Sequence, residues 1–352
     1  MISIVVPCFN CENTLYNSLE SLLGQTYTGE YQIILIDDGS IDSTPALCDD
    51  YEDKFRVIGT NGSGPQIKTF HQPNGGLMNA WKRGVKEADG EYIAFCDADD
   101  YVDADFIEQL TNVVEEHYSD IILYGMVIEY NNGEKKEHTN RLEPGYYDHE
   151  RIACEVLPKL YSNGAMQSDL IIKSRCGKMI KKTLLQQIIP DLDEGVSIGE
   201  DDIATFDAVL HADSIYCMDN YFPYHYVRNN ESMIGGYDPK IFCKLELCYK
   251  NKYAIADKYN YTYVSQIDAD YMSHYILYVK KEICKNPGSV GLVCRRLKDF
   301  RNSEIFTNLY SKVSIKGYDL TTRIFALMFI YRFYFLLVLV TRWLDKKRGR
   351  DV

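Results

Sequence analysis

Short apolar runs alternate with helical patterns along the first 130 residues of the chain. The apolar runs predict buried strands at Ile2–Val6, Ile33–Ile36, Phe55–Ile58, Glu91–Cys96 and Asp120–Tyr130. Apolar residues at helical spacing predict helices at Glu12–Leu23, Asp42–Tyr51, Leu77–Ala88 and Phe106–His117. Continuous apolar strands that alternate with helices are typical of a mostly parallel sheet, so we expect an α/β fold.

Three polar loops follow three of these predicted strands, at Pro7–Glu12, Asp37–Ser40 and Asp97–Asp100. In open parallel sheets, ligands bind beyond the carboxyl ends of the strands. The three loops are therefore expected to form one site.

The rest of the chain has a different pattern. The segment 131–235 is mixed, and we expect it to complete the first domain, 1–235, as a second half beside 1–130. A tyrosine-rich helical region is expected at 236–315, followed by a tail at 316–352 that contains the apolar run Ile324–Val340.

Charge is unevenly distributed over the 352 residues, of which 46% are apolar, enough for a sizeable core. The net charge of −13 argues against a nucleic-acid-binding protein. From Lys312 to the end there are nine basic residues and three aspartates, a net of +6, so the remainder carries −13 − 6 = −19. A basic tail on an acidic body indicates that the tail meets something anionic.

The eleven cysteines are scattered, and only Cys8 and Cys11 have the C-x-x-C spacing. No second pair completes a zinc site, and nothing else supports a redox site at this pair. We therefore expect free thiols in a reducing cytosol. The chain starts with neither a basic nor a long apolar leader, so we expect no secretory signal.

Clustered aspartates follow the strand at Glu91–Cys96. In an extended backbone, Asp97 and Asp99 point to one side, and hard carboxylate oxygens suit Mg²⁺ or Mn²⁺. Such a metal would keep open positions for phosphate oxygens. Acidic residues also favour helix starts, and that interpretation suffices for Asp103 and Asp105.

Four segments in order carry a family resemblance: Ser3–Asn10, Ile36–Ser43, Asn74–Leu77 and Gly90–Asp100. Together they resemble family 2 glycosyltransferases of the GT-A fold, of the bacterial capsule and surface-polysaccharide type, over about the first 125 residues. The resemblance implies a Rossmann-like domain, a nucleotide-sugar donor such as a UDP-hexose or UDP-N-acetylhexosamine, a divalent metal (Mn or Mg) and inversion at the anomeric carbon.

Roles follow from this resemblance at matching positions. It implies that a nucleoside pocket is lined by Pro7, Phe9 and Glu12, and that base and ribose are read by Asp37 and Asp38. It also implies that Asp99 is the main metal ligand and that Asp97 touches the ribose or the metal.

One position departs from the family pattern. The family often has Arg where this chain has Trp81. Either Lys82 or Arg83 supplies the charge from a neighbouring position, or the role is absent.

An inverting transfer needs a carboxylate to deprotonate the acceptor hydroxyl. By resemblance, Asp201 is that general base and Glu200 orients hydroxyl groups. A helix N-cap with an acidic first turn is the alternative reading of the same stretch, and the two are compatible.

Further donor contacts are expected from Lys178, Arg228 and Ser232, the last two as a clamp on the diphosphate. Lys178 also fits a solvated surface position. His225 is expected either as a third metal ligand or as a packed strand histidine.

Three functions compete at this point. The first is a glycosyltransferase that acts on a glycan acceptor, expected to be lipid-linked, in surface-polysaccharide synthesis. A sugar nucleotidyltransferase would show a glycine-rich basic loop after the first strand, which Pro7–Glu12 is not. A non-catalytic sugar- or membrane-binding scaffold would not need the intact acidic pairs.

The apolar run Ile324–Val340 has Arg332 at its centre, which disfavours a membrane span. Burial in a subunit interface of a homo-oligomer is one alternative. Basic flanks favour another, in which Lys316–Arg350 attaches a cytoplasmic enzyme to the inner face of the membrane.

Overall fold

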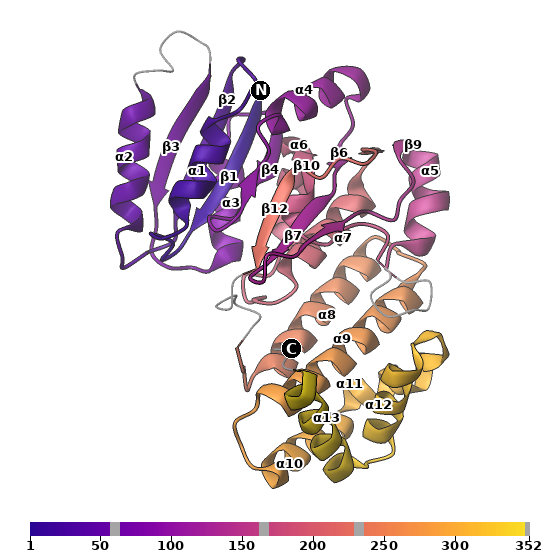
Figure 1. Ribbon diagram of the computed structural model, residues 1–352. Helices are drawn as coiled ribbons and strands as arrows, with labels where there is room; N and C mark the ends of the chain where they lie inside the picture. Colours follow the sequence, from indigo (N-terminus) through magenta and orange to yellow (C-terminus); the bar gives the residue numbers. More distant parts are fainter. Residues whose placement is uncertain (57–63, 162–168, 229–235, 349–352) are drawn as a thin grey trace. The chain divides into compact units, whose positions relative to one another are not determined.

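The structure is a computed structural model that describes residues 1–56, 64–161, 169–228 and 236–348 (Figure 1). The chain divides into two compact units. The first comprises Met1–Leu157 and Ile171–Asn229, and the second comprises Pro158–Leu170 and Asn230–Val352. The first unit is α/β and the second is helical, as the sequence predicts.

The first unit is built on an eight-stranded sheet in the order β3-β2-β1-β4-β10-β6-β11-β9. The strands are β1 (Ile2–Cys8), β2 (Tyr31–Asp37), β3 (Pro65–His71), β4 (Tyr92–Phe95), β6 (Ile121–Leu123), β9 (Gly145–Asp148), β10 (Lys178–Lys181) and β11 (Ser214–Cys217). β1, β2, β3 and β4 are mutually parallel, and β1 and β2 are buried along their whole length. A mostly parallel sheet is thereby confirmed.

One strand in the middle of this sheet runs the other way. β10 pairs antiparallel with both β4 and β6, with Met179 opposite Ala94 and Lys178 opposite Leu123. The beginning of β10 therefore lies at the edge where β4 ends. This reversal brings residues just before Lys178 to the carboxyl edge of the sheet.

Helices connect these strands. They are α1 (Leu15–Leu23), α2 (Thr44–Arg56), α3 (Leu77–Glu87), α4 (Phe106–His117), α5 (His149–Arg151), α6 (Lys182–Ile188) and α7 (Glu200–His211). Shorter helical turns are η2 (Ile152–Val156), η3 (Leu157–Lys159), η4 (Arg175–Gly177) and η5 (Ile189–Asp191). α3 packs on β1 and β2, and α2 packs on β3. Gly84 allows α3 to approach closely, because a Cβ there would lie 2.2 Å from Cγ1 of Val5.

Two strand predictions are wrong. Phe55 and Arg56 complete α2, residues 57–58 lie outside the described part, and the third strand is β3, which begins at Pro65, ten residues later than expected. β3 is an edge strand that begins at a proline and is only partly buried, so it lacks the continuous apolar run of β1 and β2.

The second error concerns Asp120–Tyr130, which is not one strand. It forms β6 and then β7 (Met126–Tyr130) in a separate sheet of order β5-β12-β7-β8. The other members are β5 (Tyr101–Val102), β8 (Lys135–His138) and β12 (Tyr224–Arg228). The break falls at Gly125, where a Cβ would lie 2.3 Å from the Phe222 ring.

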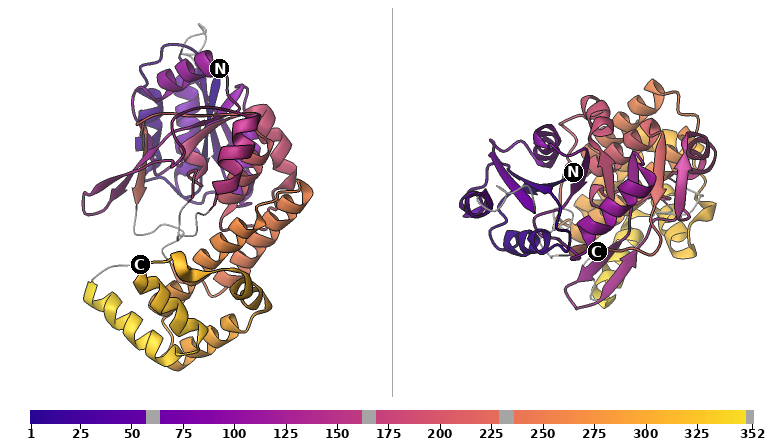
Figure 2. Two further views of the ribbon diagram at one scale, coloured as in Figure 1. Left: turned by 90° about the vertical axis from the view of Figure 1, so that its right-hand side faces the viewer. Right: turned by 90° about the horizontal axis from the view of Figure 1, so that it is seen from above.

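The second unit contains α8 (Ile241–Lys258), α9 (Val264–Lys285), α10 (Val290–Arg301), α11 (Glu304–Lys312), η6 (Ile315–Gly317), α12 (Leu320–Ile330) and α13 (Tyr334–Arg348). α8 and α9 lie side by side (Figures 1 and 2). Between them, the buried ammonium of Lys252 lies 3.1 Å from Oδ2 of Asp270, and Tyr249 donates to the same oxygen. A buried charge of this kind is paired, as it must be in a low-dielectric interior.

The apolar tail run is two helices rather than one. α12 ends at Ile330 and α13 begins at Tyr334, and Arg332 between them has a φ of 69°. Both helices pack on the rest of the unit, α13 against α9 and α10. Over the described ranges, no helix combines the length and apolar character that crossing a bilayer requires.

We expect Gly84→Ala to destabilise the first unit by about 1–3 kcal/mol, because the added methyl would overpack the contact with Val5. Gly291→Ala is the matched control. Gly291 is an exposed glycine in α10 with open space around it, so the same change should be neutral or stabilising by up to about 1 kcal/mol. Differential scanning calorimetry would measure both. A Gly84→Ala protein as stable as wild type would contradict this account of the helix–sheet contact.

Candidate functional site

The loops after β1 and β2 are joined by reciprocal hydrogen bonds. The Asn10 N–H donates to Oγ of Ser40 over 3.0 Å, and Oδ1 of Asn10 accepts from the Ile41 N–H over 2.9 Å. Oε2 of Glu12 accepts from the Ser43 N–H over 2.9 Å. These bonds fix the two loops to each other. They also show Glu12 engaged with the start of the α2 segment.

Asp37 is buried at the end of β2. Its Oδ1 accepts from the Ser40 N–H over 3.0 Å, and its Oδ2 lies 2.9 Å from Nδ1 of His71. The other ring nitrogen of His71 lies 3.0 Å from Oδ1 of Asp49. Asp37 and then Asp49 raise the pKa of His71 above its ordinary value, because both stabilise the protonated ring.

Asp38 holds the loop that precedes α3. Its two oxygens accept from the N–H groups of Gly75 (2.9 Å) and Gly76 (2.7 Å) and from the Gln72 amide (2.7 Å). A carboxylate offers about four acceptor positions, so capacity for a ligand hydroxyl remains. Gly39 beside it has a φ of 73°, and a Cβ there would lie 2.6 Å from the Asn74 nitrogen.

Pro7 is buried near the end of β1, whereas Phe9 is 51% exposed in the loop that follows. An exposed aromatic ring beside Asp37 and Asp38 has the form of a stacking surface for a base. Its role in binding a nucleoside stays a prediction.

A buried arginine joins the two acidic pairs that the sequence singles out. Nη1 of Arg175 donates to Oδ1 of Asp201 over 2.6 Å, and its Nη2 donates to Oδ1 of Asp97. Arg175 is only 6% exposed. Burial alone would lower the pKa of Arg175, but Asp201 and Asp97 together raise it well above its ordinary value, so the guanidinium stays charged.

Asp99 differs from Asp97 in its surroundings. It is exposed, and its carboxylate has no hydrogen bond or ion pair with any residue in the described ranges. Desolvation and then the charge of Asp97 raise its pKa. Desolvation, followed by Asp201, likewise raises the pKa of Glu200. An added cation would relieve this mutual repulsion.

Asp100 anchors the small sheet to the site. It is buried, accepts from the Tyr224 hydroxyl over 2.5 Å and accepts from the Val227 N–H over 2.8 Å. Burial, followed by Asp97, raises the pKa of Asp100 to about 8. The hydroxyl of Tyr224 also accepts from the Asp97 N–H over 3.1 Å, so β12 and the end of β4 are held together.

Lys178 is not the solvated lysine of one expectation, and its ammonium, expected to contact the donor, is bonded within the protein. It is 1% exposed, and its ammonium donates to the carbonyls of Ile172 and Ser174 and to Oγ1 of Thr205. An ammonium has three hydrogens, and all three have acceptors. Burial lowers the pKa of Lys178 to about 8. The lysine therefore stabilises the segment that carries Arg175.

His225 is not a metal ligand in this arrangement. Its Nδ1 lies 2.9 Å from Oε1 of Glu129, its Nε2 lies 3.0 Å from Oδ1 of Asp103, and its ring stacks on Tyr101. Both ring nitrogens are thus occupied within the protein, the arrangement that the packed alternative expects. Arg228, at the end of β12, is exposed and lies over the Tyr130 ring. Ser232 lies outside the described residues.

Nothing in the described ranges gathers three or more His, Cys, Asp or Glu side chains around one metal position. Asp97 and Asp99 remain as two carboxylates with hard oxygen donors. Such a pair fits a divalent cation only if other ligands, such as phosphate oxygens and water, complete its coordination.

Trp81 stands in the core, 2% exposed, with its ring edge-on to Phe95. The neighbouring Lys82 and Arg83 do not bring to the strand ends the positive charge of the family's Arg. Lys82 donates to the Leu192 carbonyl over 2.8 Å, and Arg83 pairs with Glu87.

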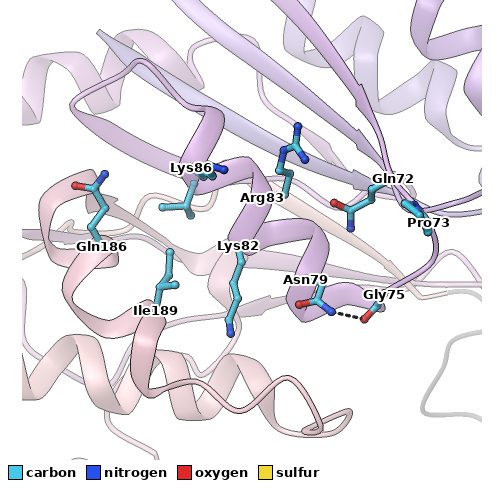
Figure 3. A pocket seen from close by; sticks show the side chains of 10 residues that line it. Gln72, Pro73, Gly75, Asn79, Lys82, Arg83, Lys86, Gln186 and Ile189 are labelled. Atoms are coloured by element: carbon cyan, nitrogen blue, oxygen red, sulfur yellow. Dashed lines mark hydrogen bonds between the residues drawn. The ribbon is translucent and has the colours of Figure 1, made fainter.

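A pocket of about 680 Å³ lies along α3, beside the loop that Asp38 holds (Figure 3). Its lining residues are Gln72, Pro73, Gly75, Asn79, Lys82, Arg83, Val85, Lys86, Gln186 and Ile189. No carboxylate is among these lining residues.

Residues 3–188 match Glycosyl transferase family 2, which covers more than half of the chain. The chain belongs to this glycosyltransferase family. The match ends before Glu200, so it includes Asp97, Asp99 and Arg175 but not the proposed base.

The family 2 chain is similar to three bacterial proteins named as glycosyltransferases. It is 29% identical over 200 residues to glycosyltransferase GlyA of Streptococcus pneumoniae, 57% of this chain and 27% of GlyA. The chain thus spans about a quarter of that relative. It is 24% identical to the putative glycosyltransferase EpsH of Bacillus subtilis over 94% of this chain and 92% of EpsH.

The third relative is TarS of Staphylococcus aureus, a poly(ribitol-phosphate) beta-N-acetylglucosaminyltransferase. The sequences are 26% identical over 67% of this chain and 37% of TarS. The crystal structure of TarS 1–349 with UDP-GlcNAc superposes with a TM-score of 0.60 and 19% identity, over 99% of this chain and 92% of that one. At this identity the likeness shows the shared fold.

Sequence reasoning does not find Arg175 or Asp100 as site residues of this family 2 chain. Arg175 precedes a strand whose antiparallel direction no local pattern reveals. Asp100 reads as one more member of an acidic run, although its burial separates it from exposed Asp99. The sequence does contain a signal for Arg175, because two basic residues of Arg-Cys-Gly-Lys lie directly beside a short apolar strand.

We expect His71→Gln to lose a pH-dependent part of the wild-type stability. Because the folded pKa of His71 is raised, its contribution is full below about pH 6.5 and is lost as the pH rises through the folded pKa. The Tm difference between wild type and His71→Gln should therefore be larger at pH 6 than at pH 9. His149→Gln, at a 77% exposed histidine, is the control and should show no such trend. A pH-independent difference for His71→Gln would contradict the assignment.

Proposed function

We propose that this protein transfers a sugar from a nucleotide-sugar donor to a glycan acceptor, with inversion, in the synthesis of a cell-surface polysaccharide. The single observation that carries the proposal is the convergence of Asp97 and Asp201 on Arg175 at the carboxyl edge of a family 2 sheet, with Asp99 near enough for Asp97 to raise its pKa. Carboxylates for a metal and a carboxylate for proton abstraction are the two components that such a transfer requires.

A uridine diphosphate sugar is the donor we propose, either a UDP-hexose or a UDP-N-acetylhexosamine. TarS, which has the same fold, has been crystallised with UDP and with UDP-GlcNAc. In this chain, the exposed ring of Phe9 would stack on the base, and Asp37 and Asp38 would accept from base and ribose. Pro7 and Glu12 would close the same pocket.

A divalent cation, Mn²⁺ or Mg²⁺, would be held by Asp99 and Asp97 together with the donor diphosphate. Asp99 fits this role because its carboxylate is exposed and its pKa is raised by desolvation and Asp97, a repulsion that a cation removes. When bound, the metal neutralises charge on the leaving diphosphate. Arg228 would bind the diphosphate beside it, with Ser232 as its partner.

Asp201 would act as the general base on the acceptor hydroxyl, and Glu200 would orient the sugar hydroxyls. Both lie in the first turn of α7, where the helix dipole stabilises negative charge. The hydrogen bond from Arg175 orients one Asp201 oxygen and leaves the other for the incoming hydroxyl. Attack from the side opposite the diphosphate would invert the anomeric carbon.

Exposed apolar side chains of the tail support a lipid-linked acceptor. Ten large apolar side chains of α12, α13 and the turn between them are exposed, and we call these the tail surface: Leu320, Ile324, Leu327, Tyr331, Phe333, Phe335, Leu336, Leu339, Val340 and Trp343. Arg332, Lys346 and Lys347 are exposed near it. Apolar side chains with basic neighbours fit an anionic lipid surface, at about 1 kcal/mol per basic residue.

We therefore propose that the tail surface holds a cytoplasmic enzyme against the inner face of the membrane, where a lipid-linked acceptor is found. Arg342, which lies within the expected attachment segment Lys316–Arg350, does not take part in this attachment. Its guanidinium donates to the carbonyls of Ile283 and Asn286 at the end of α9, so it stabilises the helical unit.

Released UDP measured with Mn²⁺ and a panel of UDP-sugars tests the transferase directly. We expect Asp201→Asn to lower turnover by about 10²–10⁴-fold and to keep donor affinity, because it faces the acceptor. Asp99→Asn should lower turnover at least about tenfold and weaken metal-dependent donor binding. Asp50→Asn removes an exposed carboxylate of α2 and is the matched control. Unchanged turnover in Asp99→Asn or Asp201→Asn would overturn that residue's assignment.

We expect Phe335→Glu/Leu339→Glu to release the protein from vesicles that contain phosphatidylserine, because charge replaces apolar contact on the tail surface. Tyr16→Glu, at a residue 59% exposed on α1, is the control and should leave sedimentation with vesicles unchanged. Light scattering on the same samples separates the alternatives. A double variant that still binds vesicles, or that changes only from oligomer to monomer, would favour a subunit interface instead.

A further inference from the structure

The guanidinium of Arg175 occupies a position at the site that neither the resemblance nor the proposed transfer assigns. It lies at the start of η4, just before β10, and is held there by the reversed direction of that strand. Two of its nitrogens bridge Asp97, on the donor side, and Asp201, on the acceptor side. One side chain therefore links the two halves of the site.

The third nitrogen of this guanidinium is also informative. Nε of Arg175 is buried and has no hydrogen-bond partner in the described ranges. An unsatisfied buried donor costs roughly 1–3 kcal/mol. The arrangement is thus not optimal for the ligand-free protein, and a change at the site could improve it.

Arg175 is the basic side chain that the structure shows in contact with these site carboxylates. At the position where the family often has Arg, this chain has Trp81, whose side chain is in the core. The neighbouring Lys82 and Arg83 have partners elsewhere. Lys178, three residues away, donates all its hydrogens to Ile172, Ser174 and Thr205. Within the described ranges, the ion-pair partner of Asp97 is Arg175.

We propose that Arg175 is an internal counter-ion that competes with the divalent cation for Asp97 and holds Asp201 in position for the acceptor. The inference rests on the proposed transferase function and deepens it. In the ligand-free protein Arg175 occupies Asp97, so the metal alone binds weakly. Donor and metal together displace Arg175 from Asp97, while its bond to Asp201 is kept.

This account makes Arg175 a positioning residue rather than a catalytic one. Its charge offsets the repulsion among Asp97, Asp99, Glu200 and Asp201 until a cation arrives. Its fork geometry matters as well as its charge, because the bridge needs two nitrogens directed at two carboxylates. A lysine would keep the charge but could satisfy only one carboxylate well.

Mn²⁺ affinity of the ligand-free protein, measured by electron paramagnetic resonance of free Mn²⁺, tests the competition. We expect Arg175→Gln to bind Mn²⁺ about tenfold more tightly than wild type, because Asp97 is released and one positive charge is removed. Arg175→Lys should be intermediate, and it carries the test if Arg175→Gln does not fold. Arg151→Gln removes an exposed arginine that pairs with Glu155 and should leave Mn²⁺ affinity unchanged.

Asp99→Asn identifies the site, since it should abolish the tight Mn²⁺ binding of Arg175→Gln in the double variant. Equal or weaker Mn²⁺ binding in folded Arg175→Gln and Arg175→Lys would overturn the competition. Mn²⁺ binding that Asp99→Asn does not affect in any background would instead contradict the metal site of the proposed function, so the two failures are distinguishable.

A double-mutant cycle on turnover tests the link to Asp201. Arg175→Gln should lower kcat by at least about tenfold in wild type, with a smaller effect on the donor KM. In an Asp201→Asn background the same change should have little further effect, because its target is gone. Full additivity of the two losses would show that Arg175 does not act through Asp201.

Discussion

Negative charge gathered at the carboxyl edge of the large sheet is the constraint on which this structure depends. Four carboxylates gather there from two places about a hundred residues apart in sequence: Asp97 and Asp99 follow β4, and Glu200 and Asp201 begin α7. The Arg175 fork between Asp97 and Asp201 balances part of that charge. The fork reaches them because β10 runs antiparallel between β4 and β6. Reversal of one strand thus places a cation where the parallel strands end.

The surrounding structure supports this edge from three sides. Asp38 holds the Gly75–Gly76 turn, Asp100 ties β12 to the end of β4, and buried Lys178 stabilises the segment before β10. Each of these polar groups is buried and hydrogen-bonded, so moving any of them would leave an unsatisfied partner. Exposed Asp99 is the exception.

Much of the first unit could be predicted from the sequence, because its strands are buried on both faces. β1 and β2 read as continuous apolar runs, and α4 begins and ends where its apolar spacing does. β3 was harder because an edge strand needs no such run, and β10 because four residues carry no sign of strand direction. The break at Gly125 depends on a contact with Phe222, a hundred residues away in sequence.

A site residue could be predicted where its type and its place in the sequence pattern are enough to indicate its chemistry. Asp97, Asp99 and Asp201 meet that condition, and the structure brings Asp97 and Asp201 together on one side chain. The surroundings of Lys178 and His225 could not be predicted in this way. Lys178 is buried and bonded to Thr205, and the His225 ring is bonded to Glu129 and Asp103. Arg175 was not predicted as a site residue for the same reason, because its contacts depend on the fold. Its partners, Asp97 after β4 and Asp201 in the first turn of α7, are far apart in sequence and meet only in the folded protein.

The central claim is that this edge binds a nucleoside diphosphate through a shared metal. Isothermal titration of UDP into the wild-type protein, in Mn²⁺ and again in EDTA, tests it most directly. The account predicts saturable one-to-one binding in Mn²⁺ that is lost in EDTA, since Asp97 and Asp99 would otherwise repel the diphosphate. UDP that binds equally well under both conditions, or does not bind in either, would contradict it.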